Sequence, residues 1–209
     1  TLDAATLQGH DSVNATVTAQ QLVLSNTSGA VGTGAGTGAG TLTLQAQGGK
    51  GQILVATGVG QGSSAQATTV GVDGFANTQL TADSSVVAAG RGGSTSLADG
   101  GTGTAGGLNV AGNLTVDAAS VTAASGSTTA LRATGKLSTV NTGKGTATAS
   151  GLGAHLLLQA DSIQVANTIA AGSGALTLLA TGAASGKASG IALQSGASLE
   201  AQGTTVTLG

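Results

Sequence analysis

The sequence predicts an all-β protein: a single-stranded parallel β-helix (β-solenoid) with about 20 residues per coil and glycine-rich loop insertions. Three observations lead to this fold class. Gly, Ala, Thr and Ser supply 129 of the 209 residues, and Leu, Val, Ile and Phe only 44, which is too few to build a globular core. A short apolar pattern recurs along the chain. Its strands are only three to five residues long and alternate between apolar and other residues.

The recurring pattern is a pair of apolar residues around a small or polar one, followed by a polar residue, Ala and a turn. Its copies are Leu22–Leu24, Leu42–Gln47, Leu114–Asp117, Leu156–Asp161, Leu176–Thr181, Ile191–Gln194 and Leu199–Gln202. Leu24 and Leu44 are 20 residues apart, as are Leu158 and Leu178. A recurring period is typical of repeat architectures and predicts that successive copies stack.

Further apolar positions lie within one period. Between Leu156 and Leu176 come Ile163 and Ile169, at steps of 7, 6 and 7 residues. Three short strands per period, separated by corners of small residues, are typical of a β-solenoid. In that fold the coils stack about 4.8 Å apart and the inward apolar side chains form continuous rows. Scattered Gly and abundant Thr and Val disfavour a helical alternative.

Glycine-rich stretches interrupt the period at 28–40, 58–64, 88–107, 141–153 and 181–190. We interpret the longer intervals there as a mixture of extra coils and extruded loops, and we expect residues 32–40 to form a flexible surface excursion. No linker divides the chain. We expect residues 1–209 to form one rod segment of roughly seven to nine coils, about 35–45 Å long, and to be a fragment of a longer chain.

The unit Leu-x-Leu-x-Ala-x-Gly is clearest in Leu42–Gly48 and Leu176–Gly182, and Leu158–Ile163 shows a corner of it. In these units, and most closely between Asn109 and Gly209, the chain resembles the repeat region of filamentous haemagglutinin-like exoproteins of the two-partner secretion pathway. The resemblance implies a right-handed parallel β-helix, export across a Gram-negative outer membrane, and a shaft that displays adhesive surfaces. The secretion domain of that family carries Asn-Pro motifs. Because this chain has no Pro, the resemblance is to the shaft alone.

The composition excludes several function classes. Without Cys there is no disulfide framework. Six basic against eight acidic residues give no electrostatic footprint for nucleic acid or an anionic membrane, and one Phe with no Trp or Tyr cannot build a base-stacking platform. No apolar run approaches the roughly 18–20 residues of a membrane span. We therefore predict neither a nucleic-acid partner nor direct membrane insertion.

Few residues are candidates for catalysis. His10 and His155 are the only histidines, and Asp161 lies six residues after His155. A general base needs such a partner at hand, but we favour a surface His on a corner. Asp83, Asp117 and Asp161 occupy matched positions of the pattern. Paired carboxylates serve glycoside hydrolysis, yet stacked like charges repel, so we interpret these three as corner residues that cap turns. We predict no enzyme activity.

Two binding functions of other solenoids leave only traces in this sequence. Asp73-Gly74 and Asp99–Gly103 resemble calcium-binding repeats but do not recur. We therefore predict no cofactor and no calcium-binding β-roll. A single calcium site in one loop is the alternative that stays open. Thr-x-Thr pairs build ice-binding faces when they repeat in a flat ladder. Here they fall at irregular spacings, in Thr16–Thr18, Thr41–Thr43, Thr146–Thr148 and Thr205–Thr207. We interpret them as outward Thr on strands.

A small set of apolar residues is predicted to face outward. If the outer members of each apolar triplet point inward, the central ones point outward. Most central residues are small or polar, but Val23, Leu54 and Leu157 are not, and Leu179 would also face outward. Two interpretations stay open for these four residues: satellite apolar clusters beneath the glycine-rich loops, or a stripe for lateral contact with a neighbouring rod or a loop-borne partner.

These observations together predict a structural and adhesive shaft of a large secreted bacterial surface protein. Its loops would contact a host or neighbouring cell surface, a glycan or sister rods. One alternative is a subunit of an extracellular filament or sheath, formed by self-association. A further alternative is a polysaccharide-processing β-helix enzyme, which the lack of aromatic stacking platforms disfavours.

Overall fold

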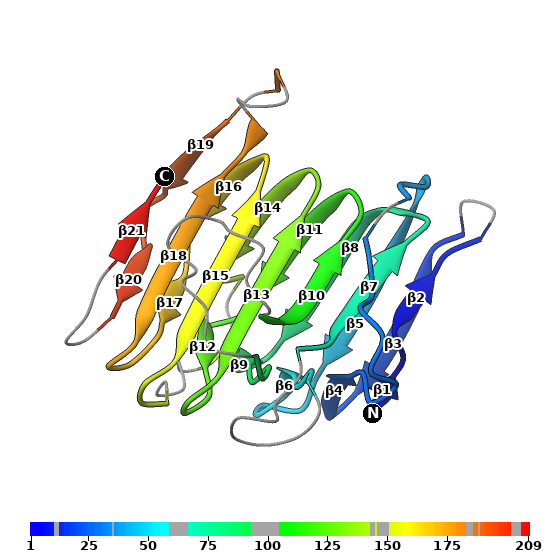
Figure 1. The fold of residues 1–209 in the computed structure, drawn as a ribbon, viewed down its shortest axis with the longest axis horizontal. Coiled ribbons are helices and arrows are strands. Elements are labelled where there is room, and N and C mark those ends of the chain that lie inside the picture. Colours follow the sequence, from blue (N-terminus) through cyan, green and yellow to red (C-terminus); the bar gives the residue numbers. More distant parts are fainter. Residues whose placement is uncertain are drawn as a thin grey trace.

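The computed structural model describes residues 1–10, 13–34, 36–58, 67–92, 105–142, 145, 151–182, 186–187, 189–201 and 206–209. These residues form an all-β structure with 21 strands in three parallel sheets of seven. The predicted all-β class with parallel strands is confirmed. Figure 1 shows the colours running from blue at one end to red at the other, so consecutive strands of each sheet lie along one axis.

We name the sheets A, B and C and give their strands in order along that axis. Sheet A consists of β1 (Leu2–Asp3), β4 (Gln21–Ser25), β6 (Gln52–Val55), β9 (Ser85–Ala88), β12 (Ser120–Ala123), β17 (Thr168–Ala170) and β20 (Ser198–Glu200). Sheet B consists of β2 (Thr6–Gln8), β7 (Thr69–Asp73), β10 (Gly106–Val110), β13 (Thr128–Ala133), β15 (His155–Ala160), β18 (Ala175–Ala180) and β21 (Val206–Leu208). Sheet C consists of β3 (Ala15–Ala19), β5 (Gly40–Ala46), β8 (Phe75–Ala82), β11 (Asn113–Asp117), β14 (Lys136–Val140), β16 (Ser162–Val165) and β19 (Gly190–Leu193).

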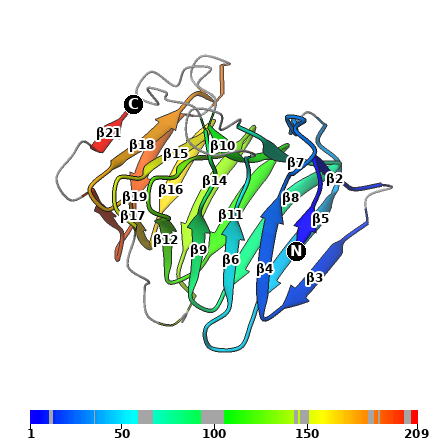
Figure 2. The same ribbon diagram turned by 60° about the horizontal axis from the view of Figure 1, so that its bottom comes forward.

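The chain visits sheets A, B and C in rotation, as in β9, β10 and β11, and then returns to sheet A in β12. Two connections omit a strand. Residues 26–39 lead from β4 directly to sheet C, and residues 141–154 lead from β14 directly to sheet B. Both coincide with predicted glycine-rich interruptions. Figure 2 shows the strands of sheet A side by side, with sheet C behind them.

The predicted period of 20 residues holds in only part of the chain. Leu158 stacks on Leu178 in sheet B, as predicted. Leu24 and Leu44, which have the same spacing, do not stack, because Leu24 belongs to sheet A and Leu44 to sheet C. Leu44 pairs instead with Leu80, so that 36-residue interval holds one passage through the sheets plus a loop. The apolar triplet cannot distinguish the sheets, since all three face the same core.

The core consists of inward rows, one residue per strand, that run across the sheets. In sheet B, one row places Leu108, Leu131, Leu158 and Leu178 in successive register, each fully buried. Corresponding rows from sheets A and C join the same apolar cluster. Burial of each such side chain contributes about 1.5–3 kcal/mol. The few large apolar residues thus serve one continuous core between the three sheets.

Residues 26–34 and 36–39 lie against sheet B, which differs from the flexible surface excursion predicted for 32–40. The Gly32 amide donates to the Thr69 carbonyl at 3.0 Å. A Cβ at Gly32 would lie 1.9 Å from the Ala5 carbonyl oxygen, and one at Gly34 would lie 2.7 Å from backbone atoms of Val110 and Ala111. The alternating glycines therefore let this segment approach the sheet backbone closely. Much of the stretches 58–64, 88–107 and 141–153 falls outside the described residues.

Candidate functional site

The carboxylates predicted to cap turns each accept hydrogen bonds from a neighbouring passage of the chain. Asp83 accepts from the amides of Gly48 and Gly49, at 2.8 and 3.2 Å. Asp117 accepts from the amide of Thr142 at 3.0 Å and from its hydroxyl. Asp117 has Thr81 and Val140 as its register neighbours, so no other carboxylate adjoins it in the ladder. The capping interpretation is confirmed for these two residues.

Two further aspartates tie passages of the chain together. Asp161 lies 2.7 Å from the Nζ atom of Lys187 in an ion pair. Asp3 accepts from the Thr27 hydroxyl at 2.6 Å and from the Thr27 amide at 2.8 Å. Both hydrogen bonds hold the pKa of Asp3 below its ordinary value, and the Thr27 hydroxyl has the larger effect of the two. Asp3–Thr27 and Asp117–Thr142 are thus the same clamp, with an aspartate at a strand end and a threonine 24 or 25 residues later.

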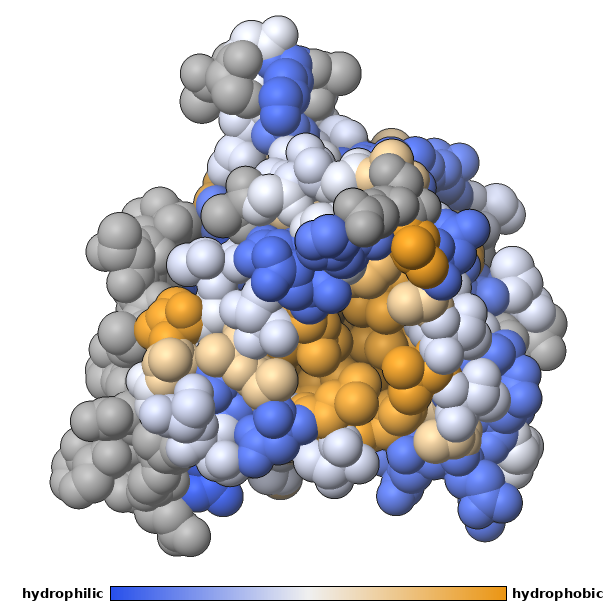
Figure 3. Space-filling view, turned by 90° about the vertical axis from the view of Figure 1, so that its right-hand side faces the viewer, coloured by the Kyte–Doolittle hydropathy of each residue, from blue (hydrophilic) through white to orange (hydrophobic). Residues whose placement is uncertain are grey.

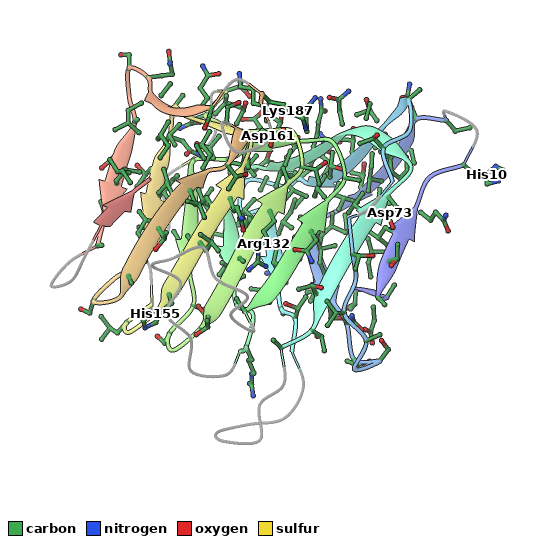
Figure 4. The ribbon with its side chains drawn as sticks, turned by 45° about the horizontal axis from the view of Figure 1, so that its top comes forward. His10, Asp73, Arg132, His155, Asp161 and Lys187 are labelled. Carbon is green, nitrogen blue, oxygen red and sulfur yellow. The ribbon has the colours of Figure 1, made fainter. Side chains whose placement is uncertain are left out.

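His155 and Asp161 do not come together. His155 is the first residue of β15, and Asp161 follows its last residue, so the two side chains lie at opposite ends of the strand, as Figure 4 shows. His10 lies at the other end of the molecule, near Asp73. Among the described residues, His, Asp and Glu form no group of three that could hold a metal ion. Asp73 accepts a long hydrogen bond from the Gly36 amide at 3.4 Å, and Asp99 lies outside the described residues.

Arg132 is a partly buried cation of sheet B. It lies on the outer side of sheet B, where its Nε atom donates to Gln159 at 3.1 Å. Burial lowers the pKa of its guanidinium. The amide oxygen of Gln159 is a neutral partner, so this hydrogen bond orients Arg132 without neutralising its charge.

The four apolar residues predicted to face outward fall into two groups. Leu157 is 0% exposed and forms a satellite cluster with Ala105 and Ala130, against which Leu179 packs. Val23 and Leu54 are register neighbours on the outer side of sheet A, and both are half-buried. The satellite-cluster interpretation thus describes Leu157 and Leu179. A lateral contact stays a prediction for Val23 and Leu54.

The structure adds one residue to that pair. Val87 pairs with Leu54 in the register of sheet A and is half-buried as well. Val23, Leu54 and Val87 therefore form an apolar row on consecutive strands. Sequence reasoning missed Val87 because its triplet, Val86 to Ala88, ends in a small residue. The register of the strands, rather than the triplet, identifies it.

Sheet C carries a continuous polar row on its outer side. The row runs Thr16, Thr43, Gln79, Thr115, Ser138 and Gln164, one residue per strand. A second row consists of Thr41, Asn77, Asn113, Lys136 and Ser162. Within the second row, the side-chain amide nitrogen of Asn113 donates to the amide oxygen of Asn77 at 3.1 Å. Sheet C therefore presents hydroxyl and amide groups from β3 to β16, and the rows end at Ala192 and Gly190 in β19.

The three outer faces differ in how far they are covered. Sheet A buries Ser120 and Thr122 on its outer side, and sheet B buries Thr69, Ala130 and Leu157. On sheet C, none of the described outward side chains in the two polar rows is buried. Thr16–Thr18 and Thr41–Thr43 meet on this face, where Thr16 is the register partner of Thr43. Gln79 and Ser138 interrupt the threonines, so the row is polar but not a regular threonine ladder.

Comparison with known proteins gave no match: no family model, no curated protein and no solved structure matches this chain. In the described part of the chain, no helix is long and apolar enough to span a membrane.

Proposed function

We propose that residues 1–209 form one segment of an extracellular rod, in which the three sheets close into a β-solenoid and sheet C offers the surface for adhesion. The resemblance of the repeats to filamentous haemagglutinin-like exoproteins supports a right-handed coil and secretion to the surface of a Gram-negative bacterium. The open polar face of sheet C is the observation that carries the adhesive role.

The arrangement of the ionisable groups supports a structural rather than a catalytic role. Asp3, Asp83, Asp117 and Asp161 each bind a residue from another passage of the chain. These contacts tie neighbouring passages together at the ends of the strands. A stack of strands joined in this way by backbone and side-chain hydrogen bonds is stiff along its axis, because each passage contacts mainly its neighbours.

The chemistry of sheet C favours a hydroxyl-rich, weakly charged partner such as a neutral glycan. Its rows combine threonine and serine hydroxyls with asparagine and glutamine amides, which both donate and accept hydrogen bonds. Lys136 is the charged member of the two polar rows, and Asp117, which ends β11, carries the opposite charge. Such a face offers many exchangeable hydrogen bonds, whereas strong electrostatic attraction is not expected.

The rod is tested by negative-stain electron microscopy of the protein purified from its source, together with its intact mass. We expect rods much longer than this segment, formed by one large polypeptide. Compact particles of about the 19.2 kDa mass of this chain would contradict the proposal.

The adhesive role of sheet C is tested by charge substitutions on matched faces. We expect Gln79→Glu with Thr115→Glu to weaken binding of the chain to cells or to an immobilised neutral polysaccharide. Gln21→Glu with Gln52→Glu, which alters the outer row of sheet A, serves as the control and should leave binding unchanged. Equal binding by both double variants would show that sheet C is not the contact surface.

A further inference from the structure

Sheet C is the sheet that the chain enters on every complete passage. Residues 26–39 omit sheet B and residues 141–154 omit sheet A, whereas sheet C receives a strand each time. From Thr41 onward, the register continues without a shift through β5, β8, β11, β14 and β16. Neighbouring strands lie about 4.8 Å apart, so equivalent outward side chains recur at that spacing along the axis.

The corners beside sheet C are short in the middle of the molecule. β8 lies between Gly74 and residues 83–84, and β11 lies between residues 111–112 and 118–119. The connection from sheet A to sheet B before β10 is much longer, at residues 89–105. Short corners leave little chain that could fold over β8 and β11, and the described side chains of the two polar rows are not buried there. The face is therefore open along the axis.

The two polar rows lie side by side on this open face. They are two residues apart on each strand, which is about 6.6 Å. Their hydroxyl and amide groups can both donate and accept hydrogen bonds, and Lys136 is the charged member of the rows. A ligand with regularly spaced hydroxyl groups and no charge of its own thus matches both the repeat and the charge of the face.

Sheet C has to hold such a ligand without aromatic stacking. The whole chain contains one Phe and no Trp or Tyr, and Phe75 is buried in the core. A sugar on sheet C is therefore bound by hydrogen bonds, each of which makes only a small net contribution. Useful affinity then requires contacts with several strands at once, which a ligand can make only if it extends along the axis.

We infer that sheet C binds an extended, uncharged glucan of the cellulose type lengthwise, between the two polar rows and parallel to the axis of the stack. Such a glucan is a straight ribbon with hydroxyl groups along both edges, so successive sugars can meet successive strands and both rows. A ligand that lay across the strands would contact few of them. The inference rests on the adhesive role proposed for sheet C and adds the shape and the direction of the ligand.

A length series of cello-oligosaccharides, from two to six glucose units, tests the direction of the ligand by isothermal titration calorimetry. We expect the affinity to rise about twofold to tenfold with each added unit, because each unit adds hydrogen bonds to a further strand. Malto-oligosaccharides contain the same glucose units in a curved chain. They should bind more weakly and gain little from added units.

Two matched double variants test the same point on the protein. Gln79→Ala with Thr115→Ala interrupts the first polar row at its middle, on β8 and β11. Thr16→Ala with Gln164→Ala removes two polar groups from the same row at its outermost positions, on β3 and β16. We expect the middle variant to bind cellotetraose about tenfold more weakly than the wild type does. The outer variant should bind it nearly as well as the wild type, since four consecutive strands keep their polar residues.

The variants are designed to leave the core intact. Viewed along the stack, apolar residues lie between the sheets and hydrophilic residues border them (Figure 3), and all four substituted residues point away from the core. If the middle variant fails to fold by circular dichroism, Gln79→Val with Thr115→Val repeats the interruption with side chains that favour strands.

Three results would overturn the inference: affinity that does not change with the length of the cello-oligosaccharide, equal binding of the straight and curved series, or equal loss of cellotetraose binding in the two double variants. A chain that binds cells but none of the oligosaccharides would also overturn it, while the adhesive role of sheet C would stand. A chain that binds neither cells nor any polysaccharide would overturn both proposals.

Discussion

At the scale of single residues, the contribution of each leucine to the stability of the fold depends on which side chains cover it. Leu157 and Leu54 are both central residues of apolar triplets and both point away from the main core. Leu157 is 0% exposed because a second apolar cluster surrounds it, whereas Leu54 stays half-buried on sheet A. Their sequence contexts are alike, yet their expected contributions to stability differ.

We predict that Leu157→Ala lowers the free energy of unfolding by about 2–5 kcal/mol, since it removes a fully buried side chain and leaves a cavity. Leu54→Ala should cost about 1 kcal/mol or less, as at a surface position. Chemical denaturation of both variants measures the difference. Similar losses for the two variants would contradict the satellite cluster.

Asp3 and Thr27 provide a pH-dependent contact at one end of the molecule. Because hydrogen bonds from Thr27 lower the pKa of Asp3, the carboxylate stabilises the folded state fully above its unfolded pKa. That contribution is lost as the pH falls through the lower folded pKa. We therefore predict that the Thr27 amide stays protected from hydrogen exchange near neutral pH and loses protection in acid.

An NMR titration of the Asp3 carboxyl group checks this contact. Thr27→Val removes the hydroxyl but keeps the amide, so it should move the pKa of Asp3 back towards the ordinary value. A wild-type Asp3 that already titrates at the ordinary value would show that the clamp is not formed in solution.

At the scale of elements, the segment 26–39 shows how a glycine-rich stretch becomes ordered. Asn26 is buried, and its amide nitrogen donates to the carbonyls of Ala30 and Thr69 at 2.7 and 2.8 Å. This side chain directs the segment onto sheet B, and the alternating glycines allow its close approach. The chain forms no strand of sheet B between β4 and β5, and this segment lies against the outer face of sheet B instead.

We predict that Gly32→Ala destabilises the protein by about 1–3 kcal/mol, because the added Cβ overlaps backbone atoms that cannot move away easily. Gly36→Ala in the same segment is the control, since no atom lies within 4 Å of its Cβ position, and it should change stability by about 0.5 kcal/mol or less. Thermal or chemical denaturation compares the two. Equal effects would mean that the segment does not lie against the sheet.

At the scale of the whole molecule, the stack is close to one-dimensional. A central strand such as β11 pairs with β8 on one side and β14 on the other, whereas β1 and β20 each pair on one side only. Local opening should therefore cost most in the middle and least at the edges. We therefore expect the strands to open progressively from the two ends towards the middle, rather than as two separate units.

We predict that native-state hydrogen exchange shows the greatest protection in β8, β11 and β13 and decreasing protection towards β1 and β20. Uniform protection along the chain would indicate one cooperative unit.

Several features could be read from the sequence because they depend on local composition. Short alternating strands and glycine corners follow from neighbouring residues alone. The position of Asp83 and Asp117 at corners follows from them too, whereas their hydrogen-bond partners lie 25 to 35 residues away in the sequence. For Val23, Leu54, Leu157 and Leu179 the sequence left two interpretations open, and the structure places Leu157 and Leu179 in a satellite cluster, while a lateral contact of Val23 and Leu54 stays a prediction. The sequence by itself determined the all-β class, the parallel stacking and the inward rows.

The tertiary structure alone decided which residues meet. The apolar triplets are interchangeable, since every sheet faces the same core, so spacing could not assign Leu24 and Leu44 to different sheets. Only the register brings Thr16, Thr43, Gln79 and Thr115 into one polar row, although they are scattered over 100 residues. On sheet B, residues 26–34 and 36–39 cover part of the outer face, whereas no described residue of the two polar rows of sheet C is buried. The alternation of inward and outward side chains is a local property of each strand. Which strand pairs with it depends on the lengths of the loops between them, and those lengths vary along the chain.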